Sequence, residues 1–238
     1  MSEVHVERRG DVVVATIDVP GRRNAADLDV YHRLEAALAL DAAGYVITGA
    51  NGDFSAGDDV RIFDFDGVEA SDAFVVDVTH VFQQIEATPR PVVAAVDGYA
   101  LGFGFELALA CDVIVASPRA VLGLPEIRHG AAPPNAMGRA PAVLGRGVTR
   151  HLALSGSHWL SGTEAHVLGM VAELHEPEAL VDQAVALADE MAAEPEFLPA
   201  KRHQGAGAEA TYRMAPVVMA PLMASTTVAA SRRRYAGG

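Results

Sequence analysis

Cysteine is scarce in this sequence, because Cys111 is the only one among 238 residues. A lone thiol excludes an intrachain disulfide, and its position in an apolar run predicts a buried thiol in a reducing compartment, not a catalytic nucleophile. The first ten residues contain early acidic residues and no apolar stretch, unlike a signal or transit peptide. These absences predict a cytoplasmic protein.

Basic residues are also scarce, with 18 Lys and Arg against 31 Asp and Glu and a formal net charge of −13. Neutralising a nucleic-acid backbone requires clustered Lys and Arg, and this chain has one basic run, the arginines at 232–234. We therefore expect no nucleic-acid partner. An anionic ligand can still bind through backbone N–H groups and a few arginines.

One apolar stretch of the sequence is long enough to raise the question of a membrane span. The stretch, residues 91–117, contains Asp97, Glu106 and Asp112, each of which costs about 2.5–3.5 kcal/mol near a bilayer centre. This stretch instead predicts a buried strand, a glycine-rich turn, a short helix and a second strand. Glu106 lies among apolar residues, and a buried carboxylate lowers stability or shifts its pKa, so the stretch is a candidate site.

Several catalytic motifs are missing as well. Gly102 and Gly104 lack the third glycine of a dinucleotide fingerprint, because Leu107 stands in its place. The sequence contains no GxSxG elbow and no HExxH pair, which removes the basis for a serine hydrolase or a zinc protease. The nine histidines show no paired spacing, so we expect no metal site.

Half of the residues are hydrophobic, enough for a sizeable core, and one main domain is expected. Strands, loops and helices alternate over the first two-thirds and helices gather after about residue 145, which predicts an α/β fold with a helical extension. Strands are expected at 4–6 and 12–18, with a hairpin around residues 9–11, and at 45–48, 121–124 and 171–173. Helices are expected at 27–40, 71–87, 137–144, 149–154, 163–168, 178–193 and 212–235. Asp27 and Ser161 are the expected caps of the helices at 27–40 and 163–168.

Three short segments carry the candidate chemistry: residues 55–59, 102–106 and 125–127. The first two are small-residue turns before helices, and such turns leave N–H groups unpaired. Two of these groups converging on one point would make an oxyanion hole. Glu106 and Glu126 would then supply the acid and the base.

These segments resemble the motifs of the enoyl-CoA hydratase/isomerase, or crotonase, superfamily. Residues 53–61 are similar to its F-S/A-A-G-x-D segment, 94–117 to A-x-x-G-x-A-x-G-G-G-x-E-L-A-L-x-C-D, and 122–133 to F-G-x-P-E-x-x-x-G-x-x-P. Residues 20–25 resemble its earlier P-x-x-x-N-A element. The order and the intervals match too, so the motifs together are far more specific than any one of them.

The resemblance implies an α/β, crotonase-like spiral of ββα units at 1–190 and a C-terminal helical trimerisation or lid region at 191–238. It implies a homotrimer or a dimer of trimers that binds an acyl-CoA thioester. No separate cofactor is expected, because coenzyme A is part of the substrate. The implied partners include neither a nucleic acid nor a membrane.

The resemblance also implies the roles of individual residues. The family stabilises a thioester enolate with two backbone N–H groups, which correspond here to Ala56 and Phe103. Glu106 and Glu126 match the carboxylates with which hydratases of the family hold and split water, so enoyl-CoA hydratase is the expected activity. The implied substrate-binding residues, with the two arginines toward the nucleotide end, are Arg22, Arg23, Ala25, Gly57, Asp58, Asp59, His129 and Pro134.

Three positions depart from the family's pattern. Phe103 replaces the middle glycine of the turn, so its ring must lie beside the acyl path or pack in the core. Pro134 lacks the N–H that helps hold the catalytic water in hydratases, so the water would bind Asn135 instead or would not be held at all. His129 occupies a usually apolar position, either as a hydrogen-bonded support or as an additional acid–base group.

The last two departures leave other reactions open, namely double-bond isomerisation or C–C bond hydrolysis of a β-dicarbonyl substrate. A non-catalytic scaffold or an RNA-binding subunit is a third interpretation, disfavoured by the acidic balance and by the presence of both glutamates. The C-terminal tail lacks the family's D-x-x-E-G element, although the arginines at 232–234 and Tyr235 could still approach the CoA phosphates.

Overall fold

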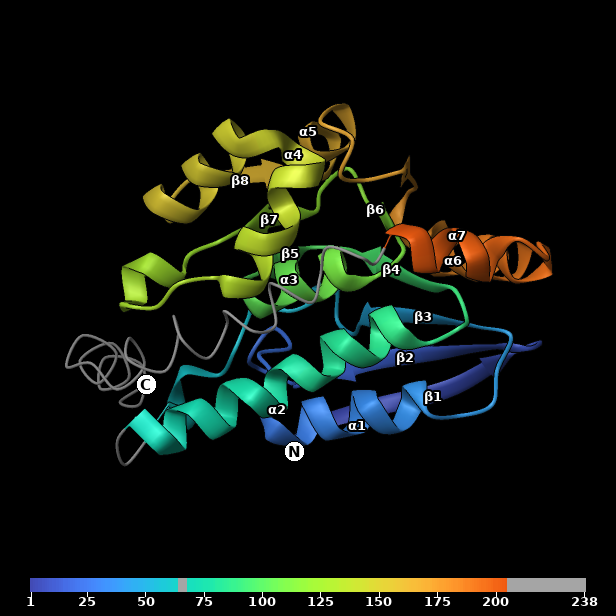
Figure 1. Ribbon diagram of the computed structural model, residues 1–238, viewed down its shortest axis with the longest axis horizontal. Coiled ribbons are helices and arrows are strands. Elements are labelled where there is room, and N and C mark those ends of the chain that lie inside the picture. Colours follow the sequence, from blue (N-terminus) through green and yellow to red (C-terminus); the bar gives the residue numbers. More distant parts are fainter. Residues whose placement is uncertain (64–67, 205–238) are drawn as a thin grey trace.

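The computed structural model describes residues 1–63 and 68–204 (Figure 1). Its strands form a six-stranded sheet in the order β1-β2-β3-β4-β6-β9 and a three-stranded sheet in the order β5-β7-β8. The strands are β1 Glu3–Arg9, β2 Val12–Asp18, β3 Gly44–Gly49, β4 Val92–Val96, β5 Tyr99–Leu101, β6 Val113–Ala116, β7 Val121–Gly123, β8 Trp159–Ser161 and β9 Glu173–Leu174. The helices are α1 Leu28–Leu38, α2 Val68–Ala87, α3 Phe103–Ala110, α4 Pro134–Ser155, α5 Gly162–Val167, α6 Pro177–Ala193 and α7 Phe197–Gln204, with short 3-10 helices η1 Val60–Ile62 and η2 Glu126–His129.

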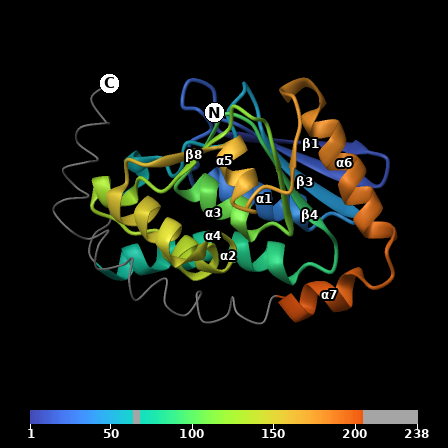
Figure 2. The same ribbon diagram turned by 90° about the horizontal axis from the view of Figure 1, so that it is seen from above.

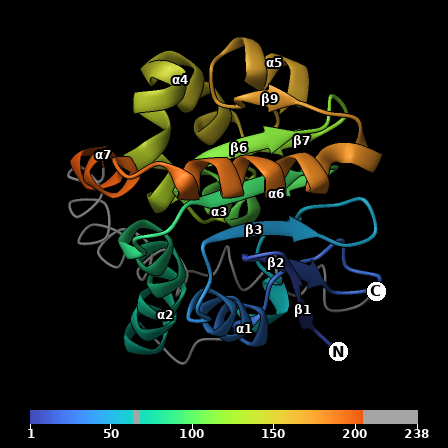
Figure 3. The ribbon, with the colours of Figure 1, turned by 90° about the vertical axis from the view of Figure 1, so that its right-hand side faces the viewer.

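The central strands of the larger sheet, β2, β3, β4 and β6, are largely buried on both faces, which explains why they are almost continuously apolar. In β2, Val13 and Ile17 face a large core beneath α1 to α5, whereas Val12 and Val14 face a smaller cluster beneath α6. Figure 3 shows α6 lying across this second face, and Figure 2 shows α6 and α1 on opposite sides of the strands. The large core therefore lies between the sheet and the helices that carry the candidate site.

A ββα unit is repeated along the middle of the chain. β4 joins the larger sheet, β5 joins the smaller one, and α3 follows; β6 and β7 then repeat this placement before α4. Both repeats pair in parallel, β4 with β6 and β5 with β7. The predicted α/β class and its ββα units are confirmed, and each unit closes with a helix, α3 in the first and α4 in the second.

Several local predictions are confirmed. β1 and β2 form the expected antiparallel hairpin around Gly10, and the Asp27 carboxylate caps α1 by accepting from the Val30 N–H at 3.2 Å. Ser161 caps α5 in a capping box with Glu164.

Other elements differ from the sequence prediction. The helices expected at 137–144 and 149–154 belong to one segment, α4, which is broken at Gly145, where φ is 71° and ψ is 157°. The two-residue β9 begins later than predicted, at Glu173. The strands β5 and β8 and the helix α7 were not predicted; each strand has three residues and α7 is a polar helix of eight, so their periodic pattern is weak.

The predicted boundary at residue 190 falls inside α6, which ends at Ala193. α7 then docks on the core through Lys201, whose Nζ donates to the carbonyl oxygens of Ile85 and Arg90 and to the Asp112 carboxylate. The predicted helix at 212–235 and the arginines at 232–234 lie outside the described residues. Over residues 1–63 and 68–204, no helix combines the length and the apolar character that crossing a membrane requires.

Candidate active site

Two turns meet at the centre of the candidate site. Ser55 pairs with the β5 strand, because its N–H donates to the Tyr99 carbonyl at 2.7 Å and its own carbonyl accepts from the Leu101 N–H at 2.9 Å. This pairing brings Gly57 beside Gly102, where a Cβ on Gly57 would stand 3.0 Å from the Leu101 carbonyl oxygen. With φ values of 106° and 54°, both glycines adopt a conformation that side chains rarely allow.

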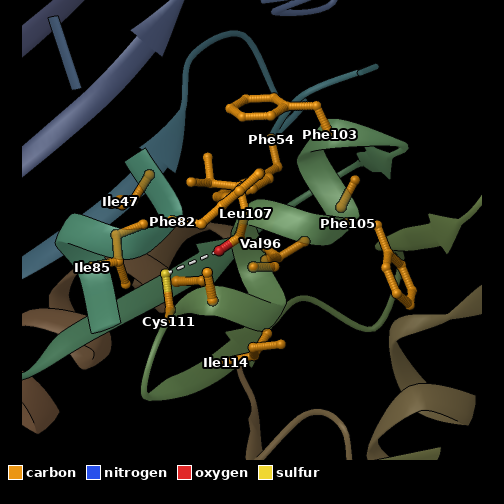
Figure 4. Close-up of a cluster of buried hydrophobic side chains, with 14 of the residues drawn as sticks. Ile47, Phe54, Phe82, Ile85, Val96, Phe103, Phe105, Leu107, Cys111 and Ile114 are labelled. Carbon is orange, nitrogen blue, oxygen red and sulfur yellow. Dashed lines mark hydrogen bonds between the residues drawn. The ribbon is translucent and has the colours of Figure 1, made fainter. Parts of the chain in front are cut away.

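Phe103 is the first residue of α3, and its N–H therefore has no partner within the helix. The ring itself is only 2% exposed and packs against Tyr31 and Phe82, at centroid distances of 4.8 and 5.7 Å. Figure 4 shows it among the buried hydrophobic side chains. Replacing the family's glycine with phenylalanine thus fills the core and leaves the backbone N–H at the helix start.

Two carboxyl groups predicted to act together line the same small cavity. Glu106 comes from the first turn of α3 and Glu126 from η2. The Glu106 Oε1 accepts from the Ala136 N–H at 2.8 Å, whereas the inaccessible Glu126 Oε2 has no partner within the described residues. This cavity, here called the acid cavity, measures about 30 Å³ and is lined by Asp58, Phe74, Val75, Val78, Glu106, Glu126, Ala132, Pro134 and Asn135.

Burial holds protons on these two acids. Burial is the largest cause of the rise in the pKa of Glu106 to about 7; the Asp58 charge adds to this rise, and the Ala136 N–H and the charge of Arg139 oppose it. Burial also raises the pKa of Glu126 well above its usual range, with the charge of Glu106 adding to the effect. The pair therefore binds at least one proton near neutral pH.

Asp58 supplies a third carboxyl group that the sequence placed only on the thioester side. Its Oδ1 accepts a hydrogen bond from the Tyr31 hydroxyl, and it lines both the acid cavity and a larger hollow outside it. Burial raises its pKa to about 6, although the Tyr31 hydrogen bond acts in the opposite direction. Asp58 thus stands at the boundary between the two hollows.

The backbone N–H groups of residues 56–59 have different partners. The Ala56 N–H, predicted to face a thioester oxygen, donates to the Arg23 carbonyl at 2.9 Å. The N–H groups of Gly57 and Asp59 donate to the Ser55 hydroxyl and the Ala26 carbonyl. Within the described residues, the Asp58 N–H accordingly stands as the unpaired one of the four.

The larger hollow, here called the arginine cleft, has a volume of about 770 Å³. It collects most of the predicted substrate-binding positions and adds others, among them Arg61, Arg128 and Trp159. Its lining is Gly21, Arg22, Ala25, Ala56, Asp58, Asp59, Val60, Arg61, Leu101, Pro125, Arg128, His129 and Trp159. The position of Arg61 directly after the 55–59 motif was the available signal for that residue.

Charges in the arginine cleft are paired and partly solvated. Asp59 accepts from Arg22 at 3.0 Å and from Arg61, and the two arginine side chains are 43% and 40% exposed. Arg23 lies apart, with its guanidinium 4.6 Å from the centre of the Tyr99 ring. His129 lines the cleft and is absent from the lining of the acid cavity.

Pro134 occupies the first position of α4, where a missing N–H is tolerated because a helix leaves that group unpaired. The next residue, Asn135, is 3% exposed and lines the acid cavity. Its Oδ1 has no hydrogen-bond partner among the described residues. The acid cavity thus contains two unpartnered acceptors, Asn135 Oδ1 and Glu126 Oε2.

No group of three or more His, Cys, Asp or Glu side chains within residues 1–63 and 68–204 is arranged to hold a metal ion. The site therefore consists of an acid cavity, an arginine cleft and the backbone N–H groups of Asp58 and Phe103, for which no backbone acceptor is found among the described residues. Such an arrangement can stabilise a developing oxyanion and transfer protons beside it.

Comparison with known proteins gives a consistent result. Residues 7–215 match the family model described as enoyl-CoA hydratase/isomerase. The chain is 33% identical to a probable enoyl-CoA hydratase of Rhizobium meliloti over 79% of this chain and 74% of that protein. It is 34% identical to the 2,3-dehydroadipyl-CoA hydratase of Escherichia coli, over 81% and 76% of the two chains. A crystal structure of an enoyl-CoA hydratase/isomerase from Mycobacterium paratuberculosis superposes with a TM-score of 0.88 at 22% identity, covering 98% of both chains.

Proposed function

The chain belongs to the enoyl-CoA hydratase/isomerase family, and we propose that it catalyses the reversible addition of water to a 2-enoyl-CoA thioester. The observation that carries this proposal is the pairing of Glu106 and Glu126 on one small cavity. Two acids in such surroundings can differ in protonation, which hydration requires because one proton is removed from water and another is added to carbon.

The arginine cleft is the proposed binding site for the coenzyme A part of the substrate. Arg22, Arg61 and Arg128 line it with positive charge that suits phosphate groups. Coenzyme A enters as part of the substrate, so the reaction needs no separate cofactor. The homotrimer or dimer of trimers stays a prediction, which light scattering of the purified protein measures.

The thioester oxygen is proposed to bind between the N–H groups of Phe103 and Asp58. The start of α3 carries partial positive charge that favours an enolate oxygen. Ala56 was the position implied by the resemblance, but its N–H donates to Arg23 in this structure. The unpaired Asp58 N–H is two residues further along the same loop, so it is the group that we assign to the hole.

The two glutamates are proposed to have different roles. The Ala136 N–H favours the ionised form of Glu106, so Glu106 is the base that removes a proton from water. Glu126 has no such donor at Oε2 and delivers its proton to the α-carbon. The water oxygen bonds to the β-carbon, the α-carbon gains a hydrogen, and the carbonyl reforms as the enolate collapses.

Asn135 is proposed to replace the water-binding N–H that Pro134 cannot supply. A water molecule in the acid cavity has two hydrogens, and Asn135 Oδ1 is an enclosed acceptor without a partner among the described residues. One hydrogen of the water points to Asn135 and the other points to Glu106. The attacking oxygen is thereby oriented without a backbone donor at residue 134.

Double-bond isomerisation is the alternative function, and the missing N–H at Pro134 is the observation that favours it. Isomerisation uses the same enolate and the same proton transfers but no nucleophilic water. The other alternative, hydrolysis of a β-dicarbonyl substrate, would use His129 as an additional acid–base group. His129 lines the outer cleft, and this position argues for hydration over that hydrolysis.

The test is to incubate the purified protein separately with a 2-enoyl-CoA, a 3-enoyl-CoA and a β-diketone, and to analyse the products by mass spectrometry. Hydration adds the mass of one water to the 2-enoyl-CoA and gives a 3-hydroxyacyl-CoA. Conversion of the 3-enoyl-CoA without hydration of the 2-enoyl-CoA would establish the isomerase instead. Cleavage of the β-diketone alone would overturn both.

A further inference from the structure

Tyr31 and Asp58 form a hydrogen-bonded pair at the wall of the acid cavity. Tyr31 comes from α1 and is 1% exposed, and its hydroxyl donates a hydrogen bond to Asp58 Oδ1. Its ring packs edge-on against Phe103 at 4.8 Å and Phe74 at 6.3 Å. A ring fixed by packing on two sides holds the hydroxyl in one place, and the hydroxyl in turn fixes the Asp58 carboxylate.

This pair adds a third acid to a site whose proposed chemistry uses two. Asp58 lines the acid cavity together with Glu106 and Glu126. Its N–H is also the group assigned above to the oxyanion hole, so backbone and side chain of one residue face the reaction from the same loop. The acidic side chain is not needed for the N–H contact, because any residue other than proline supplies that donor.

We propose that Tyr31 and Asp58 are positioning residues that set the protonation of the two catalytic glutamates. The Tyr31 hydroxyl fixes the Asp58 carboxylate beside the acid cavity. The negative charge of Asp58 keeps a proton on Glu126 while Glu106 acts as the base. This inference rests on the proposed hydratase function. It assigns Asp58 a task separate from binding coenzyme A.

The charged groups around Asp58 are consistent with this role. Asp59 follows it on the same loop and is neutralised by Arg22 and Arg61. Glu106 faces it from α3 and Glu126 from η2, where the Asp58 charge acts to raise the pKa of both glutamates.

Two further charged residues, Asp27 and Arg139, act on Tyr31 and on Glu106. On the α1 side, Asp27 adds negative charge near Tyr31, and on the α4 side Arg139 acts on Glu106. The pKa of Asp58 is about 6, so its carboxylate is mostly ionised at neutral pH and above, where the glutamates must still share a proton. Asp58 is therefore charged under the conditions in which its charge is useful.

The test compares the pH dependence of the wild-type protein with that of Asp58→Asn, which keeps the size of the side chain and the backbone N–H. Two measurements are made: the pH profile of kcat for 2-enoyl-CoA hydration, and an NMR titration of protein labelled with ¹³C at the Glu side-chain carboxyls. Signals are assigned with Glu106→Gln and Glu126→Gln. We expect the glutamate titrations and the alkaline limb of kcat to move down by about one pH unit, as removal of one nearby charge predicts.

The matched control is Asp41→Asn, which removes the same charge at an exposed loop position outside both hollows; it should leave both curves in place. Tyr31→Phe is the second variant, because it removes the hydrogen bond and keeps the ring packing. Without the hydroxyl, Asp58 binds its proton more tightly, and the glutamate titrations should move in the same direction by a smaller amount. Tyr31→Phe also decides the question if Asp58→Asn does not fold.

Unchanged glutamate titrations in both variants would overturn the proposal, as would a uniform loss of kcat with unmoved limbs, which is what a purely structural role predicts. The NMR titration needs no substrate. If the wild-type protein hydrates no enoyl-CoA, the proposed function fails while the titration still reports whether Asp58 controls the glutamates. The two failures are therefore distinguishable.

Discussion

The acid cavity and the arginine cleft both border Asp58, yet their charged groups differ in burial and in pairing. In the cleft, Asp59 is paired with Arg22 and Arg61, and both arginine side chains are about two-fifths exposed to solvent. In the cavity, Glu126 Oε2 has no partner among the described residues, and burial raises the pKa of all three carboxyl groups. Solvent screens the first set of charges and is excluded from the second.

This difference separates binding from chemistry. A screened, paired charge changes a binding equilibrium by a small factor when it is removed. An enclosed acid with a raised pKa holds a proton at neutral pH, and this proton is the one that the reaction moves. The same enclosure lowers folding stability, because an ionised carboxyl in the cavity loses its hydration. Substitutions in the two hollows should therefore differ in kind as well as in size.

The largest expected effect comes from Glu126→Gln, which keeps the shape of the side chain and removes its transferable proton. We expect kcat for 2-enoyl-CoA hydration to fall by about 10²- to 10⁴-fold, the usual contribution of one general acid, with little change in KM. Stopped-flow or steady-state absorbance of the enoyl thioester measures both constants. Turnover equal to that of the wild type would show that Glu126 is not the general acid. It would also contradict the proposed division between a catalytic acid cavity and a binding cleft.

Replacing Asn135 with leucine tests the proposed water site in the same cavity. We expect kcat for hydration to fall by about 10- to 100-fold, because the water loses one of its acceptors and its orientation. The control is exchange of the α-proton of a saturated acyl-CoA with D₂O, followed by NMR, since this exchange uses the oxyanion hole and a glutamate but no attacking water. Equal losses of hydration and exchange would mean that Asn135 supports Glu106 and does not hold the water.

A stability measurement tests the cavity from the folding side. The pKa of Glu106 is raised to about 7, so between its ordinary value near 4.5 and about 7 the folded state retains a proton that the unfolded chain has released. Stability is therefore lost as pH rises through this window, and Gln cannot contribute to that loss. We expect Glu106→Gln to have a higher Tm than the wild type above pH 7, with the gain disappearing near pH 4.

The measurement is a series of thermal unfolding curves from pH 4 to pH 8. Glu190→Gln is the matched control, because Glu190 is exposed on α6 and touches neither hollow. A Tm difference that stays constant across this range, or one that grows toward acid, would contradict an enclosed carboxyl at position 106. A gain in stability together with a loss of activity would show that the acid cavity is kept for its chemistry.

The sequence predicted those parts of the site that depend on short-range pattern. Glu106 follows a glycine turn at a helix start, and Glu126 follows the next strand, so parallel pairing of β5 with β7 brings the two together. The hairpin, the Asp27 cap and the Ser161 cap have local signals of the same kind. A few neighbouring residues determine the turn, the hairpin and the caps, whereas the meeting of the two glutamates also requires the pairing of β5 with β7.

Other features depend on packing between distant segments. The Tyr31 hydroxyl reaches Asp58 only because α1 packs beneath the turn, and the Phe103 ring finds its place against the same tyrosine. The Ala56 N–H is engaged because Arg23 adopts a left-handed conformation, with φ of 49°, that presents its carbonyl. No periodicity encodes these contacts, so the sequence indicated the acids but not their third partner or the unpaired N–H.

The smallest effect is expected in the arginine cleft, from Arg22→Ala and Arg61→Ala. Each removes a partly exposed cation that pairs with Asp59, and in the proposed complex each contacts a phosphate through screened charge. We expect KM for the CoA thioester to rise by about two- to fivefold with kcat unchanged, and the rise to shrink as salt is added. A thioester of pantetheine, which lacks the nucleotide, should show no difference between variant and wild type, and Arg33→Ala on the exposed side of α1 is the matched control. If kcat falls instead, these arginines act on the acid cavity, and the two hollows are coupled through Asp59 and Asp58 instead of being separated by them.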